Sequence, residues 1–239
     1  MMIYEKEYEL RISDFDSSDQ LKSTAVLDIF QSMADKHAHV LNIGFDDLIK
    51  KDLVWVLLRS RFDIISPIRF GTDTVIAKTW PHKAGRVDFD RDYLVEDLNG
   101  NVLVKGSSKW CVINYKTRRI AINGGVAYPD GEYYPLANYQ DGLKKLPDFD
   151  ISGAEKFTGY AGDSTLDHNG HVNNVEYCRF IIDALKLAKD EKIKFIELNY
   201  INEMQVGEYE LYFKKEGNNR LIRGFSQGKE SFRAVVGLF

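Results

Sequence analysis

The chain has 239 residues, which suits one large domain or two domains of ordinary size. Hydrophobic residues make up 44% and charged residues 28%, a balance that is typical of a globular protein and excludes a fibrous or disordered one. The formal net charge of −4 argues against a dedicated nucleic-acid-binding protein, because such proteins carry an excess of basic residues.

Cysteine content and hydropathy indicate in which cellular compartment the protein is expected. The two cysteines, Cys111 and Cys178, are too few for a disulfide framework or a four-thiolate metal site, and we expect both to be reduced. No apolar run approaches the ~20 residues that span a bilayer. The first eight residues lack the basic start and apolar run of a signal peptide, so we expect a cytoplasmic protein without a membrane span.

The first half of the chain predicts one helix followed by strands. Apolar residues recur at helical spacing at Val26, Ile29, Phe30, Met33 and Ala34, which predicts an amphipathic helix with one buried stripe. Alternating or continuous apolar segments then predict strands at 54–64, 74–80, 86–95, 102–104 and 109–113.

A segment rich in turn-forming residues follows. Three of the five prolines, Pro129, Pro135 and Pro147, fall between residues 123 and 148 together with several glycines. We expect a linker over residues 123–150, with a short helix near 137–144, between domains at 1–122 and 151–239.

The second half repeats the first pattern. Cys178, Ile181, Ile182, Leu185 and Ala188 predict a second amphipathic helix, which Asn173 or Asn174 can cap. Strands are expected at 196–200, 209–213, 221–225 and 232–236.

An internal repeat explains this symmetry. Residues 13–23 resemble residues 164–174 at a constant separation of 151 residues, as between Asp16 and Asp167. Each copy leads into its helix and then into strands that have no intervening helices, which argues against a parallel α/β sheet. The expected fold class is α+β: two tandem hotdog units, each a long helix wrapped by a curved antiparallel β-sheet.

Polar residues cluster just before the second helix. Asp167, Asn169 and His171 are two residues apart, so extended backbone would place all three on one side. The adjoining helix start offers free N–H groups and the positive end of the helix dipole, which suit the oxyanion of an acyl transfer. The competing interpretation is that these are only turn and capping residues beside a structural histidine.

Residues 165–177 have the sequence Thr-Leu-Asp-His-Asn-Gly-His-Val-Asn-Asn-Val-Glu-Tyr. This stretch closely resembles the motif of acyl-acyl carrier protein thioesterases, and Trp-Val-Leu-Leu-Arg at 55–59 resembles another segment of that family. The resemblance covers nearly the whole chain. It implies hydrolysis of fatty acyl thioesters on acyl carrier protein, with release of free fatty acid.

The resemblance also implies site residues. Asp167, Asn169 and His171 match the family's Asp-x-Asn-x-His, and Glu203 matches its downstream acidic residue. Plant members have a cysteine directly after this glutamate, where this chain has Met204, so we favour attack by water. Glu203 would act as general base on this water or orient it, and Asn169 and His171 would hold water or substrate. Asp167 would fix the geometry; an alternative gives Asp167 the base or nucleophile role.

The expected site also needs a hydrogen-bond donor to the oxyanion. We expect it to be a backbone N–H at the helix start, that of Val172 or Asn173.

The first copy lacks most of these groups. Asp16 is retained, but Ser18 and Gln20 stand at the places of Asn169 and His171. Pro67 stands opposite Glu203 when Gly71 is set against Gly207. We therefore expect one active site per chain, in the C-terminal half, while the resemblance implies that the N-terminal half forms the acyl pocket.

Several alternatives remain open at this level: an acyl-coenzyme A thioesterase, a non-catalytic acyl-thioester binding protein, and a hotdog enoyl-thioester hydratase, whose Asp-x-Asn-Pro-x-His signature is not matched here. We expect no cofactor and no metal, and a homodimer is one assembly that the sequence leaves open. An acidic carrier protein would dock on basic residues. The two densest basic runs are Lys105, Lys109, Lys116, Arg118 and Arg119, and Lys186, Lys189, Lys192 and Lys194.

Overall fold

The computed structural model describes residues 2–122, 125–188 and 191–239. The chain divides into two compact units, Met1–Leu143 and Lys144–Phe239. The division falls inside the expected linker 123–150, whose first two residues, Asn123 and Gly124, lie outside the described residues, as does Lys189 of the second basic run. No helix among the described residues is long and apolar enough to cross a membrane.

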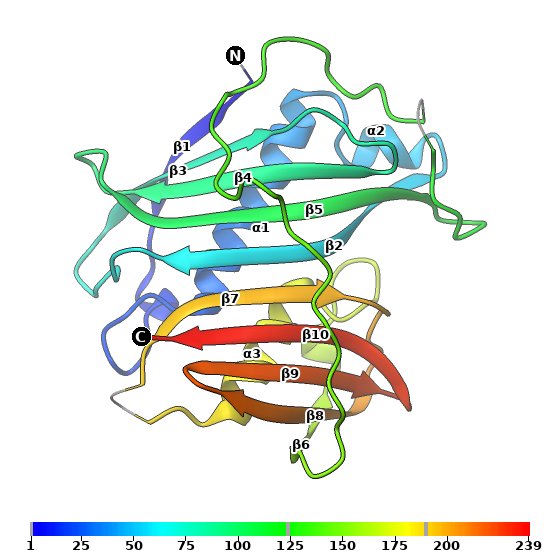
Figure 1. Cartoon of the computed structure of the whole chain (residues 1–239). Coiled ribbons are helices and arrows are strands. Elements are labelled where there is room, and N and C mark those ends of the chain that lie inside the picture. The colour runs from blue at the N-terminus through cyan, green and yellow to red at the C-terminus, as the bar shows by residue number, and fades with distance from the viewer. Residues whose placement is uncertain (1, 123–124, 189–190) are drawn as a thin grey trace. The chain divides into compact units, whose positions relative to one another are not determined.

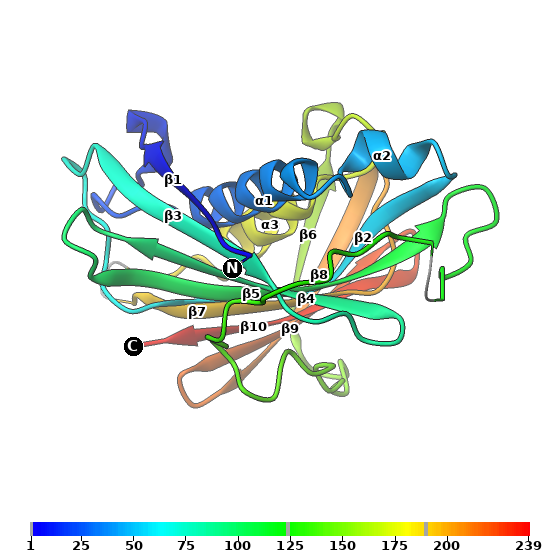
Figure 2. The same cartoon turned by 90° about the horizontal axis from the view of Figure 1, so that it is seen from above.

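Unit 1 is a five-stranded antiparallel sheet with a long helix against one face (Figures 1 and 2). In the sheet the strands lie side by side in the order β1-β3-β4-β5-β2. Along the chain the elements are β1 (Tyr4–Glu9), η1 (Ile12–Asp14), α1 (Ser23–Val40), α2 (Phe45–Ile49), β2 (Leu53–Ile64), β3 (Thr74–Pro81), β4 (Asp88–Glu96) and β5 (Val102–Asn114).

The core of unit 1 forms where α1 packs on the sheet. Phe30 of α1 stacks on Tyr93 of β4 with ring centroids 4.3 Å apart, and both side chains are buried. Beneath that ring lies Gly106 of β5, where a Cβ atom would meet Phe30 Cε2 at 2.1 Å. The absence of a side chain at 106 therefore lets the helix approach the sheet closely.

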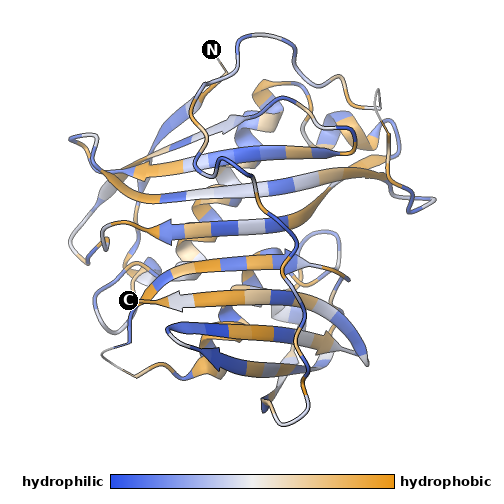
Figure 3. Cartoon of the chain, in the orientation of Figure 1, coloured by the Kyte–Doolittle hydropathy of each residue, from blue (hydrophilic) through white to orange (hydrophobic). Residues whose placement is uncertain are grey.

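Unit 2 has the same architecture in a shorter form. Its strands lie in the order β7-β10-β9-β8-β6, all antiparallel (Figure 1). Its elements are β6 (Glu155–Ala161), η2 (Asp163–Thr165), α3 (Asn174–Leu185), β7 (Ile193–Tyr200), β8 (Gly207–Glu216), β9 (Asn219–Ser226) and β10 (Lys229–Leu238). Hydrophilic and hydrophobic residues alternate along its strands, as expected of a sheet buried on one face (Figure 3).

The two units share one topology, because β1 and β6, β3 and β8, β4 and β9, β5 and β10, and β2 and β7 occupy equivalent places. The predicted helix-then-strands order is therefore correct but incomplete, since β1 and β6 precede the helices. The segments expected at 102–104 and 109–113 form the single strand β5, and residues 137–144 form no helix. The second helix ends at Leu185, before Ala188.

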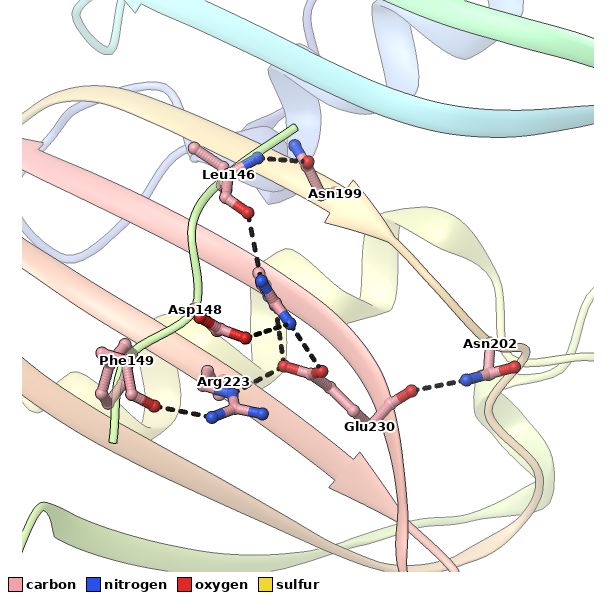
Figure 4. A network of polar contacts seen from close by, with 8 residues as sticks. Leu146, Asp148, Phe149, Asn199, Asn202, Arg223 and Glu230 are labelled. Atoms are coloured by element: carbon pink, nitrogen blue, oxygen red, sulfur yellow. Dashed lines mark hydrogen bonds and ion pairs between the residues drawn. The ribbon is translucent and has the colours of Figure 1, made fainter. Parts of the chain in front are cut away.

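Residues 146–149 cross the face of the unit 2 sheet that lies opposite α3 (Figure 4). Leu146 N donates to Asn199 Oδ1 at 2.7 Å, and Arg223 Nη1 donates to the carbonyl of Phe149 at 2.6 Å. Arg223 and Arg233 lie directly opposite each other on β9 and β10, and Glu230 accepts from both at 2.7 and 2.9 Å. The glutamate thus offsets the repulsion between two like charges that hold this segment.

Candidate active site

The cluster predicted before the second helix folds as a closed turn. Leu166 and Val172 form an antiparallel bridge, and Asp167 N donates to His171 O at 2.8 Å. Gly170 has φ of +76°, a conformation that glycine adopts without strain. The expectation of extended backbone with three residues on one side is therefore wrong: the chain turns back, so that Asp167 and His171 meet at the base of the turn.

The Asp167 carboxylate organises this turn. Its Oδ1 accepts from Asn169 N at 2.8 Å and from His171 N at 3.2 Å. Both bonds fix backbone, as aspartate commonly does two residues ahead in a turn. Asp167 therefore has a geometric task in this conformation.

The structure brings His171 and Glu203 together. Glu203 lies in the loop between β7 and β8, and its Oε2 is 3.4 Å from His171 Nε2. The two side chains are 35% and 37% exposed, so solvent reaches both groups. A carboxylate next to an imidazole can accept a proton from a water molecule that either group holds.

The loop that carries Glu203 is fastened to β10. Ile201 N and Asn202 N both donate to Ser231 O, at 2.8 and 3.1 Å. The side-chain amide of Asn202 donates to Glu230 O at 2.7 Å. These bonds define the position from which Glu203 extends.

Asn169 is exposed at the tip of the turn, and its side-chain amide forms no hydrogen bond with another residue that the structure describes. It is therefore not joined to the pair of His171 and Glu203 in this structure. An amide in that position can donate to a carbonyl oxygen from outside the protein.

The backbone N–H groups expected at an oxyanion have other acceptors. Asn173 N donates to Thr165 O at 2.9 Å, so Asn173 does not supply a free donor, and the expectation for it is wrong. Val172 N points to Met204 O over a longer 3.4 Å. Asn173 is instead the N-cap of α3, as expected for one of the two asparagines, because its Oδ1 accepts from Val175 N at 3.1 Å.

Neither Cys111 nor Cys178 forms a disulfide, and both are buried. Cys178 of α3 is fully buried, and burial raises the pKa of the Cys111 thiol. Neither thiol has the exposure that a nucleophilic cysteine needs. Among residues 2–122, 125–188 and 191–239, no group of three or more His, Cys, Asp or Glu side chains is placed to hold a metal ion.

Unit 1 contains the same turn without the same chemistry. Ser18 N and Gln20 N donate to Asp16 Oδ1 at 2.7 and 3.1 Å, and Asp16 N donates to Gln20 O at 2.8 Å. Leu21 N donates to Ile68 O at 2.9 Å. This bond matches that of Val172 with Met204, so Pro67 takes the place of Glu203.

Tyr177, the last residue of the motif at 165–177, is a further residue near the site that the sequence did not predict. It is 3% exposed, and its hydroxyl accepts from Met204 N at 3.0 Å, next to Glu203. A comparison of the two copies could have pointed to Tyr177, because its counterpart in the first copy is Val26, which has no hydroxyl.

Family models match both halves of the chain. Residues 1–122 match the acyl-ACP thioesterase N-terminal domain, and residues 161–222 match the C-terminal domain. The second match includes the turn at 166–172 and the loop with Glu203.

Curated relatives include a chloroplastic palmitoyl-acyl carrier protein thioesterase of Cuphea hookeriana, 25% identical over 84% of this chain and 52% of its own length. A chloroplastic oleoyl-acyl carrier protein thioesterase of Arabidopsis thaliana is 25% identical over 84% of this chain and 60% of its own length. The chain thus spans about half the length of the curated relatives it matches.

Two solved structures share the fold over the whole chain. An acyl-ACP thioesterase from Bacteroides thetaiotaomicron has a TM-score of 0.86 at 22% identity, covering 99% of this chain and 98% of the other. A 12:0-ACP thioesterase from Umbellularia californica has a TM-score of 0.86 at 23% identity, covering 99% and 97%. With the double hotdog fold and both domain models in agreement, the chain belongs to the acyl-ACP thioesterase family.

Proposed function

We propose that this chain hydrolyses the thioester of fatty acyl-acyl carrier protein and releases free fatty acid in fatty acid biosynthesis. The observation that carries the proposal is the approach of His171 Nε2 to Glu203 Oε2, at 3.4 Å, in a half-exposed place. The family membership of the chain supports the same reaction. The curated relatives are named as acyl-carrier-protein hydrolases and thioesterases.

In the proposed mechanism, Glu203 is the general base. A water oxygen attacks the thioester carbonyl carbon while one of its protons passes to Glu203, and His171 orients the water. The C–S bond then breaks, and the carrier's thiolate takes the proton from Glu203. The fatty acid and the carrier's thiol leave. Asn169 donates to the carbonyl oxygen as charge grows there, and the positive end of the α3 dipole stabilises that charge.

Asp167 is proposed as the residue that shapes the turn. Its Oδ1 already accepts two backbone N–H groups, and Asp16 makes the same two bonds in the unit that lacks the other polar groups. This parallel favours a geometric role over the base or nucleophile role. We also propose that the N-terminal unit holds the acyl chain. The proposed domains are residues 1–122 and 151–239, joined by a linker at 123–150.

An acidic carrier protein requires exposed positive charge. Lys109 does not provide it, because it is buried and its Nζ lies 2.7 Å from Asp88 Oδ2 and 2.8 Å from Asp90 Oδ1. Lys116, Arg118 and Arg119 are exposed, although Lys116 Nζ also lies 2.8 Å from Asp52 Oδ1, and we propose these three residues for docking.

Location and assembly also remain proposals. Cys111 and Cys178 form no disulfide, which is consistent with a reducing compartment, and we propose the cytoplasm. The curated plant relatives are chloroplastic. A homodimer would be detected by light scattering on the purified chain.

The test is a thiol-release assay on acyl carrier protein and coenzyme A thioesters of several chain lengths, with free fatty acid measured in parallel. We expect one fatty acid per thiol and faster turnover on the carrier protein. His171→Gln, which installs the residue of the unit 1 turn, should lower kcat about 100-fold, because the group that orients the attacking water is lost.

Gln20→Ala is the matched control at the equivalent position in unit 1, and its kcat should equal that of the unchanged chain. Consumption of a trans-2-enoyl thioester without thiol release would instead identify a hydratase. Equal thiol release by His171→Gln would contradict the assignment of the site.

A further inference from the structure

Tyr177, in the first turns of α3, contacts the loop that carries Glu203. Its side chain is 3% exposed, and its hydroxyl oxygen accepts the N–H of Met204 at 3.0 Å. Met204 directly follows Glu203, so this N–H belongs to the peptide group that Glu203 begins. A bond at this peptide limits the directions in which the Glu203 side chain can extend.

The other end of Met204 is held as well. Its carbonyl accepts from Val172 N at 3.4 Å, and Val172 directly follows His171. Met204, which is 1% exposed, therefore links the neighbour of His171 to the helix that carries Tyr177. We name this arrangement of Tyr177, Met204 and Val172 the Met204 clamp.

The ring of Tyr177 is fixed by its neighbours. It packs edge-to-face against Tyr200 and Phe232, with centroids 5.2 and 5.3 Å away. Burial raises the pKa of Tyr177 to about 12 against the lowering effect of the Met204 N–H, and the charges of Glu203 and Asp167 raise it further. The hydroxyl is therefore neutral at ordinary pH and can keep accepting the Met204 N–H.

Unit 1 shows that the fold does not need this hydroxyl. Leu21 N bonds to Ile68 O at 2.9 Å, which repeats the Val172–Met204 contact. The residue at the place of Tyr177 is Val26, which has no group to accept an N–H. The additional bond occurs in the half that has histidine and glutamate, and is missing where Gln20 and Pro67 replace them.

We infer that Tyr177 is a positioning residue for the proposed hydrolysis: through the Met204 clamp it holds Glu203 beside His171. The inference rests on the proposed function, and Tyr177 itself touches no substrate. Removing the hydroxyl frees the loop to sample directions in which Glu203 is too far from His171 to share a water molecule. Because small misplacements of a catalytic group are costly, turnover falls while substrate binding remains.

The test compares Tyr177→Phe with the unchanged chain on acyl carrier protein thioesters. We expect kcat to fall about 10-fold and KM to stay within about twofold, while the denaturation midpoint shifts little because the ring is kept. Tyr200→Phe is the matched control, since it keeps a ring that packs on Tyr177 and removes a hydroxyl that donates to Asn174 O at 3.2 Å. Its kcat should remain unchanged.

A second comparison separates positioning from general packing. In a Glu203→Gln background, Tyr177→Phe should lower the residual kcat no further, because it acts through Glu203. A 10-fold loss that persists in that background, or an unchanged kcat in Tyr177→Phe alone, would overturn the inference while leaving the hydrolase proposal standing. Absence of thiol release by the unchanged chain would instead reject the proposed function.

Discussion

Asp16 and Asp167 occupy equivalent turns in the two units, and only the turn of Asp167 lies beside the proposed active site. Asp16 and Asp167 each accept two backbone N–H groups through Oδ1, at 2.7 and 3.1 Å and at 2.8 and 3.2 Å. Only Asp167 lies in the turn that ends at His171. An aspartate in this motif is thus explained by backbone geometry before any catalytic role is considered.

Replacement of either aspartate by alanine should remove the oxygen that accepts two backbone N–H groups in a partly solvated turn. We expect Asp16→Ala and Asp167→Ala each to lower the free energy of unfolding by about 1 kcal/mol in urea titrations. Only Asp167→Ala should also lower kcat, because its turn carries His171. Asp167→Asn, which keeps one acceptor oxygen, should retain most activity; a loss as large as that of Glu203→Gln would make Asp167 the base.

At the scale of elements, α1 carries a buried histidine that must stay neutral. His37 is 3% exposed, and its Nδ1 lies 3.0 Å from Nη1 of the buried Arg91 on β4. Burial, and then the Arg91 charge, lower the pKa of His37 to about 4 from its ordinary 6.5. The neutral ring accepts from the guanidinium, whereas an imidazolium would repel it.

The stability of the fold should therefore fall in acid. Between pH 6.5 and 4 the unfolded chain binds a proton at His37 that the folded chain excludes, so the free energy of unfolding decreases as pH falls through this window. The contribution is on the order of 2 to 3 kcal/mol. Urea titrations at several pH values should show a flatter profile for His37→Gln.

His39→Gln, a change at a more exposed position on the same helix, is the control and should keep the original slope. Identical pH profiles for His37→Gln and the unchanged chain would contradict this account.

Elements with strong hydrophobic periodicity were predictable from the sequence, and weakly patterned ones were not. The stripe from Cys178 to Leu185 gave a helix, but Ala188 fits the same period and lies beyond it, because Lys186 adopts a left-handed conformation with φ of 46°. The strand β6 was missed because it is an edge strand, largely exposed and paired only with β8 among the described strands. Edge strands need little apolar alternation.

In the candidate site, too, some features were predictable from the sequence and others were not. Residue spacing predicted His171, and the family resemblance alone implied Glu203. The two lie 32 positions apart in the sequence, and the structure brings them together. The turn conformation was not predicted, since it depends on Gly170 and on backbone bonds to Asp167. The Met204 clamp was not predicted either, since it depends on a contact between α3 and a distant loop.

At the scale of the whole molecule, both units have the same fold, but only unit 2 has the polar groups of the proposed active site. Strand order, turn and helix start agree between the units, whereas Ser18, Gln20 and Pro67 replace Asn169, His171 and Glu203. Unit 1 is therefore an internal reference for which features of unit 2 the fold requires. By that comparison, the fold does not require His171 and Glu203, and we propose that the two groups act together on one water molecule.

A double-mutant cycle on thiol release tests this claim most directly. His171→Gln and Glu203→Gln should each lower kcat on acyl carrier protein thioesters about 100-fold, with little change in the denaturation midpoint. If the two groups act on one water molecule, the double variant should lose no more than about threefold beyond the slower single variant. Losses that multiply, or single variants as active as the unchanged chain, would contradict a shared site at His171 and Glu203.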